Sequence, residues 1–519
     1  MGNPLNQSRQ LRFGLSAASG LLLALSFPQF GLPAVAWVAL APLLVALQSA
    51  APRDAFLMGL VTGLVYFTGT LYWITNVMAM YGDLPFPVAV LINFLLIAYL
   101  SLFPALFAMV VSRLSIVIGA RSLVLAPCVW VATELGRMYV MTGFPWVLLG
   151  YSQVTVLPIA QFASIAGVFG LSLLVASVSA ALAYAALRGR VAPVSGARGS
   201  VFAPYRPLVL VLGLVLAIGS WGAARIRTAA LTRAGEPVKV GLIQGNVDQA
   251  DKWDPARAST IFRQYLDMTR SAIGRGAQLV LWPESSTPFF FEEDRPGAEM
   301  VRAVAREARV PILLGSDQID RSTNPPSYYN SAFLVRPDGS TGGVYRKMHL
   351  VPFGEYVPLK QLLFFASRLV ENVSDFSAGD AVVLLPARGH LVSTAICYEI
   401  VYPDLVRKAA ASSELITTIT NDAWFGRTSA PYQHFAQASM RAIENGRYLV
   451  RSANTGITGI VDPYGRVLAQ TGLFEPAVVV GDARFLRTTT IYARIGDVAA
   501  TASAVVTLAA LLLVRRRVE

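Results

Sequence analysis

The feature that most constrains this chain is a series of apolar segments within its first 236 residues. Seven of them reach or approach the length of about 20 residues that a helix needs to cross a bilayer. We place them near 12–28, 33–50, 56–77, 86–112, 121–140, 158–187 and 206–224, with an eighth near 497–514. The first segment leads into further spans without a convincing cleavage site, so its pattern is not that of a signal peptide. We therefore expect an α-helical membrane bundle of about eight spans.

Positive charge lies on only one set of the short loops. Twelve arginines occupy the two ends of the chain and the loops on that side, namely Arg9, Arg12, Arg53, Arg113, Arg121, Arg188, Arg190, Arg198, Arg206 and Arg515–Arg517. The alternate loops, around 29–32, 78–85 and 141–157, contain no Lys or Arg. Because loops rich in Lys and Arg stay in the cytoplasm, this asymmetry predicts that both ends of the chain are cytoplasmic. With seven spans before it and one after it, the polar region 237–485 is then expected on the outer face.

The composition fits a membrane protein. Charged residues make up 14% of the chain and hydrophobic residues 54%, whereas about 25% of an ordinary soluble protein is charged. The net charge of +12 comes with arginines between apolar segments and with no DNA- or RNA-binding motif, so we expect the bilayer as a partner and no nucleic acid. The two cysteines and the three histidines, His349, His390 and His434, show no metal-ligand spacing. We expect no metal and no cofactor.

Two ionisable residues, Glu134 and Arg137, lie near the outer end of the fifth predicted span. Ionisable residues at such positions often face a cavity or snorkel to the interface. A role at the level of the lipid headgroups and simple snorkelling both fit this position.

Region 237–485 has the pattern of a soluble α/β domain. Apolar, β-branched stretches alternate with amphipathic ones, and turn sequences such as Pro337–Gly339 separate paired strands. Hairpins mixed with strand–helix units predict mixed sheets with helices packed outside, rather than a purely parallel sheet. The chain thus divides into a seven-span bundle at 1–236, an α/β domain at 237–485, and a last span with a cytoplasmic tail at 486–519.

The stretch Leu391–Glu399 (LVSTAICYE) is an apolar run that ends in a thiol, a phenol and a carboxylate. Its length and β-branched content predict a buried strand, which would deliver Cys397 to the rim of a sheet. Cysteine is also among the most commonly buried residue types, so an inert core cysteine is the competing interpretation. Cys128 lies in an apolar span, so a disulfide between the two is not expected.

Three predicted strands of this domain end in a reactive side chain, at Glu284, Lys347 and Cys397. A carboxylate, an ammonium and a thiol form a complete set for nucleophilic acyl chemistry. The carboxylate takes the thiol proton, the thiolate attacks a carbonyl carbon, and the ammonium with a backbone N–H stabilises the oxyanion. A nearby lysine also lowers the pKa of a thiol.

The motifs around these residues resemble those of a known family. WPE at 282–284, RKMHLVPFGEYVP at 346–358 and ICYE at 396–399 are similar to the Glu-Lys-Cys triad motifs of the carbon–nitrogen hydrolase (nitrilase) superfamily. With QGNVDQADKW at 244–253, NDAWFG at 421–426 and the surrounding spans, nearly the whole chain resembles the apolipoprotein N-acyltransferases of that superfamily. The resemblance implies an α-β-β-α sandwich whose triad faces the outer side of the bacterial inner membrane, in the periplasm.

The resemblance also implies an activity and residue roles. It predicts transfer of an acyl chain from a phospholipid, typically phosphatidylethanolamine, to the α-amino group of the diacylglyceryl-cysteine of an apolipoprotein, the last step of lipoprotein maturation. Cys397 is then the nucleophile, Glu284 the general base and Lys347 the oxyanion stabiliser. A ping-pong mechanism through a Cys397 thioester follows, because two bulky lipid substrates take turns in one pocket.

The same resemblance assigns supporting residues. Tyr398 supplies an oxyanion N–H, Glu355 orients the lysine, and Glu399 matches a further essential position; structural ion pairs are the competing interpretation for the two carboxylates. Trp253 matches a tryptophan near the active-site entrance, and Trp253 and Trp424 are the candidate substrate-binding residues; ordinary packing is the alternative for both. We expect His349 to be a structural neighbour of the motif rather than a proton shuttle.

Two apolar stretches are candidates for lipid access, Thr287–Phe291 and Leu362–Val370. Exposed patches of this kind mark membrane or ligand contact, but both could equally belong to the core. Two rival functions also remain. A membrane-tethered nitrilase-type amidase would pass the acyl group to water with the same triad. A transporter or receptor with a binding domain would need more ionisable residues in its spans than this chain has.

Overall fold

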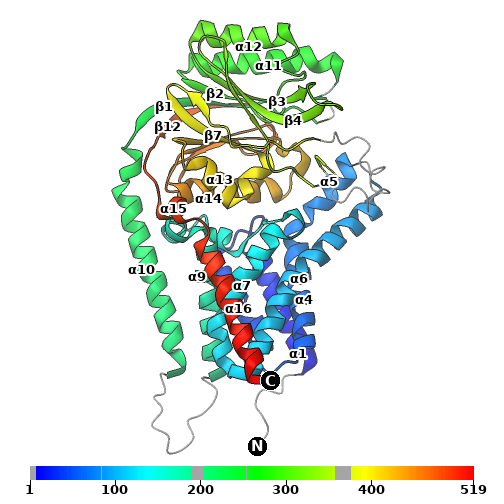
Figure 1. Cartoon of the computed structure of the whole chain (residues 1–519), viewed down its shortest axis with the longest axis vertical. Helices are drawn as coiled ribbons and strands as arrows, with labels where there is room; N and C mark the ends of the chain where they lie inside the picture. The colour runs from blue at the N-terminus through cyan, green and yellow to red at the C-terminus, as the bar shows by residue number, and fades with distance from the viewer. Residues whose placement is uncertain are drawn as a thin grey trace, which may run out of the picture. The chain divides into compact units, whose positions relative to one another are not determined.

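The computed structural model describes residues 8–82, 84–188, 203–249, 251–252, 254–352, 354–356 and 376–518 (Figure 1). Trp253 and the stretch 362–370 lie outside the described residues. The chain forms two compact units. The first comprises Met1–Asn76, Pro85–Arg227 and Ile495–Glu519, and the second comprises Val77–Leu84 and Thr228–Arg494.

The first unit is helical. Its helices are α1 (Arg9–Leu25), α2 (Pro33–Ala39), α3 (Ala41–Ala46), α4 (Pro52–Leu71), the first part of α5 (Trp73–Tyr81), α6 (Phe86–Ile118), α7 (Ser122–Tyr139), α8 (Leu157–Ala160), α9 (Ala163–Arg188), α10 (Arg206–Thr228) and α16 (Val498–Val518). Each apolar segment predicted from the sequence coincides with one or more of these helices.

The expected number of about eight spans is not confirmed by helix length. Within the described residues, five stretches are long and apolar enough to cross a membrane: Pro52–Leu71, Phe86–Thr142, Ala163–Arg188, Ala203–Thr232 and Val498–Arg516. The second of these contains both α6 and α7, which meet at a 3-10 turn. The helix α1 has only 17 residues, and the predicted second span is broken at Leu40 into α2 and α3, of 7 and 6 residues.

Small residues allow α4 and α6 to pack closely. A Cβ at Gly59 would lie 2.3 Å from the Pro104 carbonyl oxygen, and one at Gly63 would lie 2.7 Å from the Ser101 Cα. Close approach at small residues is a common way for helices to associate within a membrane, where there is little hydrophobic driving force between them.

Glu134 and Arg137 are both buried within the helical unit, and both bond to the segment that follows α7. Glu134 Oε1 accepts the Leu149 N–H at 2.7 Å. Arg137 Nη1 donates to the Trp146 carbonyl oxygen at 2.7 Å. Their burial argues against snorkelling, and the two residues hold an irregular loop in place.

The second unit contains two six-stranded sheets. Its strands are β1 (Glu236–Gln244), β2 (Leu279–Leu281), β3 (Ile312–Asp320), β4 (Ser327–Val335), β5 (Thr341–Arg346), β6 (Leu385–Ala387), β7 (His390–Ile396), β8 (Leu415–Thr420), β9 (Leu449–Ala453), β10 (Gly459–Val461), β11 (Val467–Gln470) and β12 (Ala477–Phe485). Its helices are α11 (Pro255–Gly274), α12 (Arg295–Ala308), α13 (Pro403–Ala410), α14 (Ala430–Asn445) and most of α15 (Ile491–Ile495).

Both sheets are mixed, as the sequence predicts. The strand orders are β12-β1-β2-β3-β4-β5 and β11-β10-β9-β8-β7-β6. Within each sheet three neighbouring strands run parallel, β1-β2-β3 and β9-β8-β7, and the outer pairs are antiparallel. A parallel crossover needs a helix, whereas an antiparallel pair needs only a turn, which explains why helices and hairpins alternate along the sequence.

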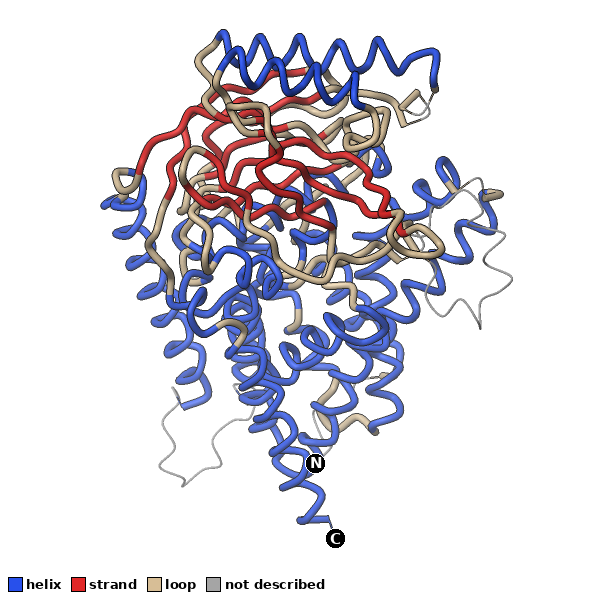
Figure 2. The backbone as a smooth tube through the Cα atoms, turned by 45° about the horizontal axis from the view of Figure 1, so that its top comes forward, coloured by secondary structure: helices blue, strands red, loops and turns tan. Residues whose placement is uncertain are grey.

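The sheets stack face to face between two helical layers, which confirms the expected α-β-β-α sandwich (Figures 1 and 2). One apolar core lies between the sheets, where Leu242 of β1 and Leu281 of β2 share a cluster with Ile396 of β7 and Ile419 of β8. A second core joins the outer face of the first sheet to α11 and α12. Alternate residues of β1 point into the two cores, since successive side chains of a strand face opposite sides.

Candidate active site

Side chains from four separate segments converge where the strands end. Glu284 follows β2, Lys347 follows β5, Cys397 follows β7, and Asn421 follows β8. In open sheets with parallel strands, ligands bind beyond the carboxyl ends of the strands. The sandwich therefore brings the three predicted triad residues to one location.

Lys347 lies between two buried carboxylates. Its Nζ donates to Glu355 Oε1 at 2.8 Å and lies 3.4 Å from Glu284 Oε1. Asn330 Nδ2 donates to the same two oxygens, at 2.7 Å to Glu284 and 3.0 Å to Glu355. Glu355 Oε2 also accepts the Val351 N–H at 2.8 Å, so the Glu355 side chain is tied to the backbone four residues before it. This arrangement leaves Lys347 little freedom to move.

The charge state of the cluster follows from burial and from these partners. Burial alone would raise the pKa of Glu284, but Lys347 and the Asn330 amide hold it below its ordinary value. Burial alone would lower the pKa of Lys347, but Glu355 and Glu284 raise it. At neutral pH, Glu284 is therefore a carboxylate and Lys347 an ammonium.

The backbone fits tightly around Glu284. A Cβ at residue 315 of β3 would lie 2.7 Å from the Glu284 Cα, so the strand needs a glycine beside the carboxylate. On the other side, the Asn421 N–H donates to Glu284 Oε2 at 2.7 Å. One oxygen of Glu284 thus faces the lysine, and the other is held by the strand end that also carries Trp424.

Cys397 begins a 3-10 turn, Cys397–Val401, directly after β7. Its φ of 53° is left-handed, a conformation that costs an L-residue roughly 1–2 kcal/mol. The thiol is buried, and it interacts electrostatically with both Glu284 and Lys347. Burial and the Glu284 charge raise the pKa of Cys397, and Lys347 opposes that rise. The resting thiol is protonated beside a base that is ionised.

Glu399 makes no ion pair in the described part of the chain; instead it joins the Cys397 turn to the Lys347 strand end. Its Oε2 accepts the Ile396 N–H at 2.7 Å. Its Oε1 accepts the Tyr345 hydroxyl at 2.8 Å and the Met348 N–H at 2.7 Å. Burial raises the pKa of Glu399 to about 7, and the hydrogen bonds limit the rise because they favour the charged form.

Tyr398 and His349 form an aromatic group beside the turn. The His349 and Tyr402 rings have centroids 3.8 Å apart, and Tyr398 meets Tyr402 edge-to-face at 5.3 Å. Burial and Lys347 lower the pKa of His349 to about 4, so its imidazole is neutral at physiological pH.

The two aromatic stretches named from the sequence differ in their surroundings. Trp424 is 38% exposed, and its ring meets the Tyr81 ring edge-to-face at 5.1 Å. The Tyr81 hydroxyl also donates to the Ala423 carbonyl oxygen at 3.0 Å. In Thr287–Phe291, by contrast, Phe291 is fully buried against Phe333 and belongs to the core.

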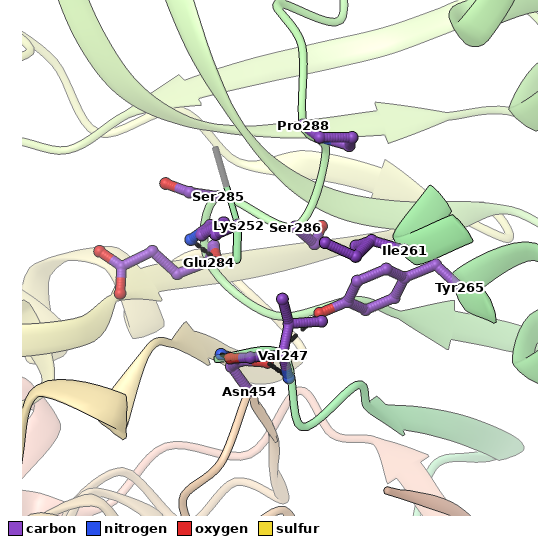
Figure 3. Close-up of a pocket in the computed structure, with 9 residues that line it drawn as sticks. All are labelled: Val247, Lys252, Ile261, Tyr265, Glu284, Ser285, Ser286, Pro288 and Asn454. Carbon is purple, nitrogen blue, oxygen red and sulfur yellow. Dashed lines mark hydrogen bonds between the residues drawn. The ribbon is translucent and has the colours of Figure 1, made fainter. Parts of the chain in front are cut away.

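Several buried groups of the site were not identified from the sequence. Asn330 and Lys252 are the nearest of them; Lys252 Nζ lies 3.5 Å from the Glu284 carbonyl oxygen. Figure 3 shows Lys252 and Glu284 among the residues that line a pocket beside the base, which Tyr265 and Asn454 also line. The lysine of the DKW sequence at 251–253 is itself a signal for a charged group at the site, beside the tryptophan. Among the described residues, no group of three or more His, Cys, Asp or Glu could hold a metal ion.

Comparisons with known proteins match both units of the chain. Residues 19–181 match the model of the apolipoprotein N-acyltransferase N-terminal domain, and residues 239–491 match that of the carbon-nitrogen hydrolases. The apolipoprotein N-acyltransferase of Geobacter metallireducens is 42% identical, covering 93% of this chain and 91% of that protein. That of Methylococcus capsulatus is 35% identical, covering 93% and 92%. An amidase from Nesterenkonia sp. of solved structure is 23% identical, with a TM-score of 0.36, covering 49% of this chain and 93% of that one.

Proposed function

The chain belongs to the apolipoprotein N-acyltransferase family, and we propose that it acts by transferring an acyl chain through a thioester on Cys397. The protein is a membrane acyltransferase of lipoprotein maturation, with a lipid as donor and a lipoprotein as acceptor. The proposal names phosphatidylethanolamine as the donor and the α-amino group of a diacylglyceryl-cysteine as the acceptor. The observation that carries it is the position of Lys347, held between Glu284 and Glu355 and next to the Cys397 thiol.

In the first half-reaction, Glu284 takes the Cys397 proton and the thiolate attacks the ester carbonyl carbon of the phospholipid. Lys347 Nζ and the Tyr398 N–H stabilise the oxyanion that forms, which in such sites commonly supplies a large part of the rate enhancement. The C–O bond then breaks, and the leaving glycerol oxygen takes the proton from Glu284. The products are a lysophospholipid and a thioester on Cys397.

In the second half-reaction, the neutral α-amine of the acceptor attacks the thioester carbonyl carbon. Glu284 takes a proton from the attacking nitrogen, and the same two donors stabilise the second oxyanion. The C–S bond breaks, an amide forms, and Glu284 returns the proton to Cys397 Sγ. Splitting the transfer in this way means that the two large lipid substrates need not occupy the site together.

The proposed location is the bacterial inner membrane, with the catalytic domain 237–485 in the periplasm. The absence of Lys and Arg from the loops around 29–32, 78–85 and 141–157 supports it, because basic loops stay in the cytoplasm. Cysteine labelling in intact cells tests it. A cysteine introduced near Arg188 should not react with an impermeant reagent, and reaction there would reverse the topology.

The comparisons do not favour the amidase alternative. The match to the carbon-nitrogen hydrolases covers 239–491 only, whereas the relatives named as N-acyltransferases match about 93% of the chain, including the membrane helices. A hydrolase would also release fatty acid without an acceptor. An N-acyltransferase should hold its acyl group until the amine arrives.

Intact mass spectrometry of the purified protein mixed with phosphatidylethanolamine alone tests the proposal. We expect a mass gain of one acyl chain that Cys397→Ala abolishes and that a diacylglyceryl peptide discharges. Steady release of fatty acid with no acylated protein would support the amidase instead. Repeating the measurement with phosphatidylglycerol tests the headgroup, and equal rates with the two lipids would remove phosphatidylethanolamine as the preferred donor.

A further inference from the structure

A buried group of charged side chains lies behind Cys397, apart from the Glu284–Lys347 cluster. Asp422 follows β8, His434 lies on α14 and Arg451 lies on β9, and all three side chains are fully buried. Arg451 Nη2 donates to Asp422 Oδ2 at 2.7 Å and lies 3.1 Å from His434 Nδ1. A Cβ at Gly456 would lie 2.3 Å from Asp422 Oδ2, so the backbone closes tightly over this group.

This group touches the nucleophile on two sides. His434 Nε2 lies 3.1 Å from the Cys397 carbonyl oxygen. Thr420 hydrogen-bonds with the Cys397 thiol, and its Oγ1 donates to Asp422 Oδ1 at 2.9 Å. None of these contacts takes part in the reaction steps described above, and burial of ionisable groups is costly unless they are paired.

The partner of His434 Nε2 requires a proton on that nitrogen. A carbonyl oxygen only accepts, so the contact with Cys397 requires Nε2–H. His434 Nδ1 lies 3.1 Å from Arg451 Nη2, a donor, and 3.0 Å from Asp422 Oδ1, an acceptor, and the contact with the Cys397 carbonyl requires Nε2–H whichever of the two Nδ1 bonds to. Burial and Arg451 lower the pKa of His434, and the contacts with Asp422 and the Cys397 carbonyl oppose that fall.

The Cys397 carbonyl and the Tyr398 N–H belong to one peptide group. In a planar trans peptide the C=O and N–H bonds point in opposite directions. A donor that holds the carbonyl on the side of His434 therefore turns the Tyr398 N–H to the opposite side. The left-handed backbone of Cys397 makes such a hold necessary, because this conformation is unfavourable for an L-residue.

We propose that His434 is a positioning residue for acyl transfer: its Nε2–H holds the Cys397 carbonyl and thereby aims the Tyr398 N–H at the oxyanion. Asp422 and Arg451 fix the plane of the imidazole. The inference rests on the proposed function, in which the Tyr398 N–H is an oxyanion donor.

Two amide substitutions separate the contacts of His434. In His434→Gln, the amide nitrogen reaches the place of Nε2 and can still donate to the Cys397 carbonyl. In His434→Asn, the shorter side chain reaches only the place of Nδ1, so that donor is lost. His390→Asn is the matched control, since His390 contacts Glu414 and Glu236 at the opposite end of β7.

The readouts are single-turnover formation of the acyl-enzyme from phospholipid and alkylation of Cys397 by iodoacetamide. Alkylation is a displacement at a CH₂ group and forms no oxyanion. We expect acylation to fall about 10- to 100-fold in His434→Asn, because a misplaced oxyanion donor costs rates of this order. Alkylation should remain within about threefold, and His434→Gln and His390→Asn should keep most of the acylation rate.

Each other outcome overturns the inference. If acylation and alkylation fall together in folded His434→Asn, the histidine only supports the fold. If acylation is unchanged there, the carbonyl contact has no role. Should His434→Asn not fold, His434→Gln decides alone, and a tenfold loss of acylation with normal alkylation contradicts the positioning role. Failure of the proposed function is distinguishable, because the wild-type protein itself would then form no acyl-enzyme.

Discussion

Glu399 Oε1 accepts the backbone N–H of Met348 at 2.7 Å, so the carboxylate two residues after the nucleophile is bonded to the residue that follows Lys347. The same carboxylate accepts the Ile396 N–H from the residue before Cys397. One side chain therefore joins two strand ends that lie on different sheets. The spacing between the proposed nucleophile and the proposed oxyanion stabiliser depends on it.

Glu399→Gln should lower both stability and acylation. The amide replaces one acceptor by an NH₂ group, which must face a backbone N–H or the Tyr345 hydroxyl. A buried group left without its partner costs about 1–3 kcal/mol, so a clear fall in the thermal midpoint is expected. Glu414→Gln is the control, because that carboxylate is partly exposed and bonds to side chains only. Equal midpoints for the wild-type protein and Glu399→Gln would show that the bridge is dispensable.

Glu284→Gln should slow acyl transfer strongly and yet make Cys397 more reactive toward a small alkylating reagent. The Glu284 charge raises the pKa of Cys397, and Lys347 lowers it. Removing the carboxylate takes away one of the effects that raise this pKa, while burial and the Lys347 charge remain, so more thiolate is present at a given pH. The measurement is the pH profile of iodoacetamide alkylation, which should move to lower pH, while acylation falls by about 10²–10⁴. In Lys347→Met the alkylation profile should move the opposite way. A profile unmoved by either change would place both charges away from the thiol.

Cys397→Gly should be more stable than Cys397→Ala, although neither transfers acyl groups. The φ of residue 397 is 53°, where glycine fits without strain and alanine does not. The expected difference is about 1 kcal/mol, visible as a higher thermal midpoint for the glycine variant. Cys128→Ala should keep its activity. Substantial transfer by either Cys397 variant would mean that another nucleophile is at work.

Tyr81→Ala should slow acylation more than Tyr81→Phe. The Tyr81 hydroxyl and ring hold Ala423 and Trp424, two and three residues after the Asn421 N–H that binds Glu284. The phenylalanine variant loses one hydrogen bond and should cost roughly threefold, whereas alanine also removes the ring contact and should cost about tenfold. The measurement is single-turnover acylation, with Tyr72→Phe as a control away from these contacts. Equal rates in both Tyr81 variants would rule out this coupling.

His349→Phe should reduce the loss of folding stability that occurs as the pH is lowered. The pKa of His349 is about 4 in the folded protein, below the value of about 6.5 for an unperturbed histidine. Between these values the unfolded chain binds the proton and the folded one does not, so stability present above pH 6.5 is lost as the pH falls towards 4. Phenylalanine preserves the ring contact with Tyr402 and removes the titration. Thermal midpoints at several pH values in this range test this, and an unchanged slope would contradict it.

The sequence by itself determined the class of each part of the chain. Helical segments appear wherever about 20 apolar residues run together, since a helix satisfies its backbone hydrogen bonds within one segment. Mixed sheets appear where hairpin turns alternate with strand–helix units, because these patterns are local. The number of spans does not follow from hydropathy alone, because the predicted second span is broken at Leu40 into two short helices.

Only the tertiary structure decided which polar groups meet at the strand ends. Asn421 reaches Glu284 across 137 positions of sequence, and Asn330 reaches it across 46. The residue types of Glu284, Lys347 and Cys397 indicate reactive groups. An asparagine or a buried histidine gives no comparable indication in the sequence. The contact between His434 and Cys397 depends on the packing of α14 beside the turn. A hydrogen bond depends on distance and direction in space, and a sequence specifies neither.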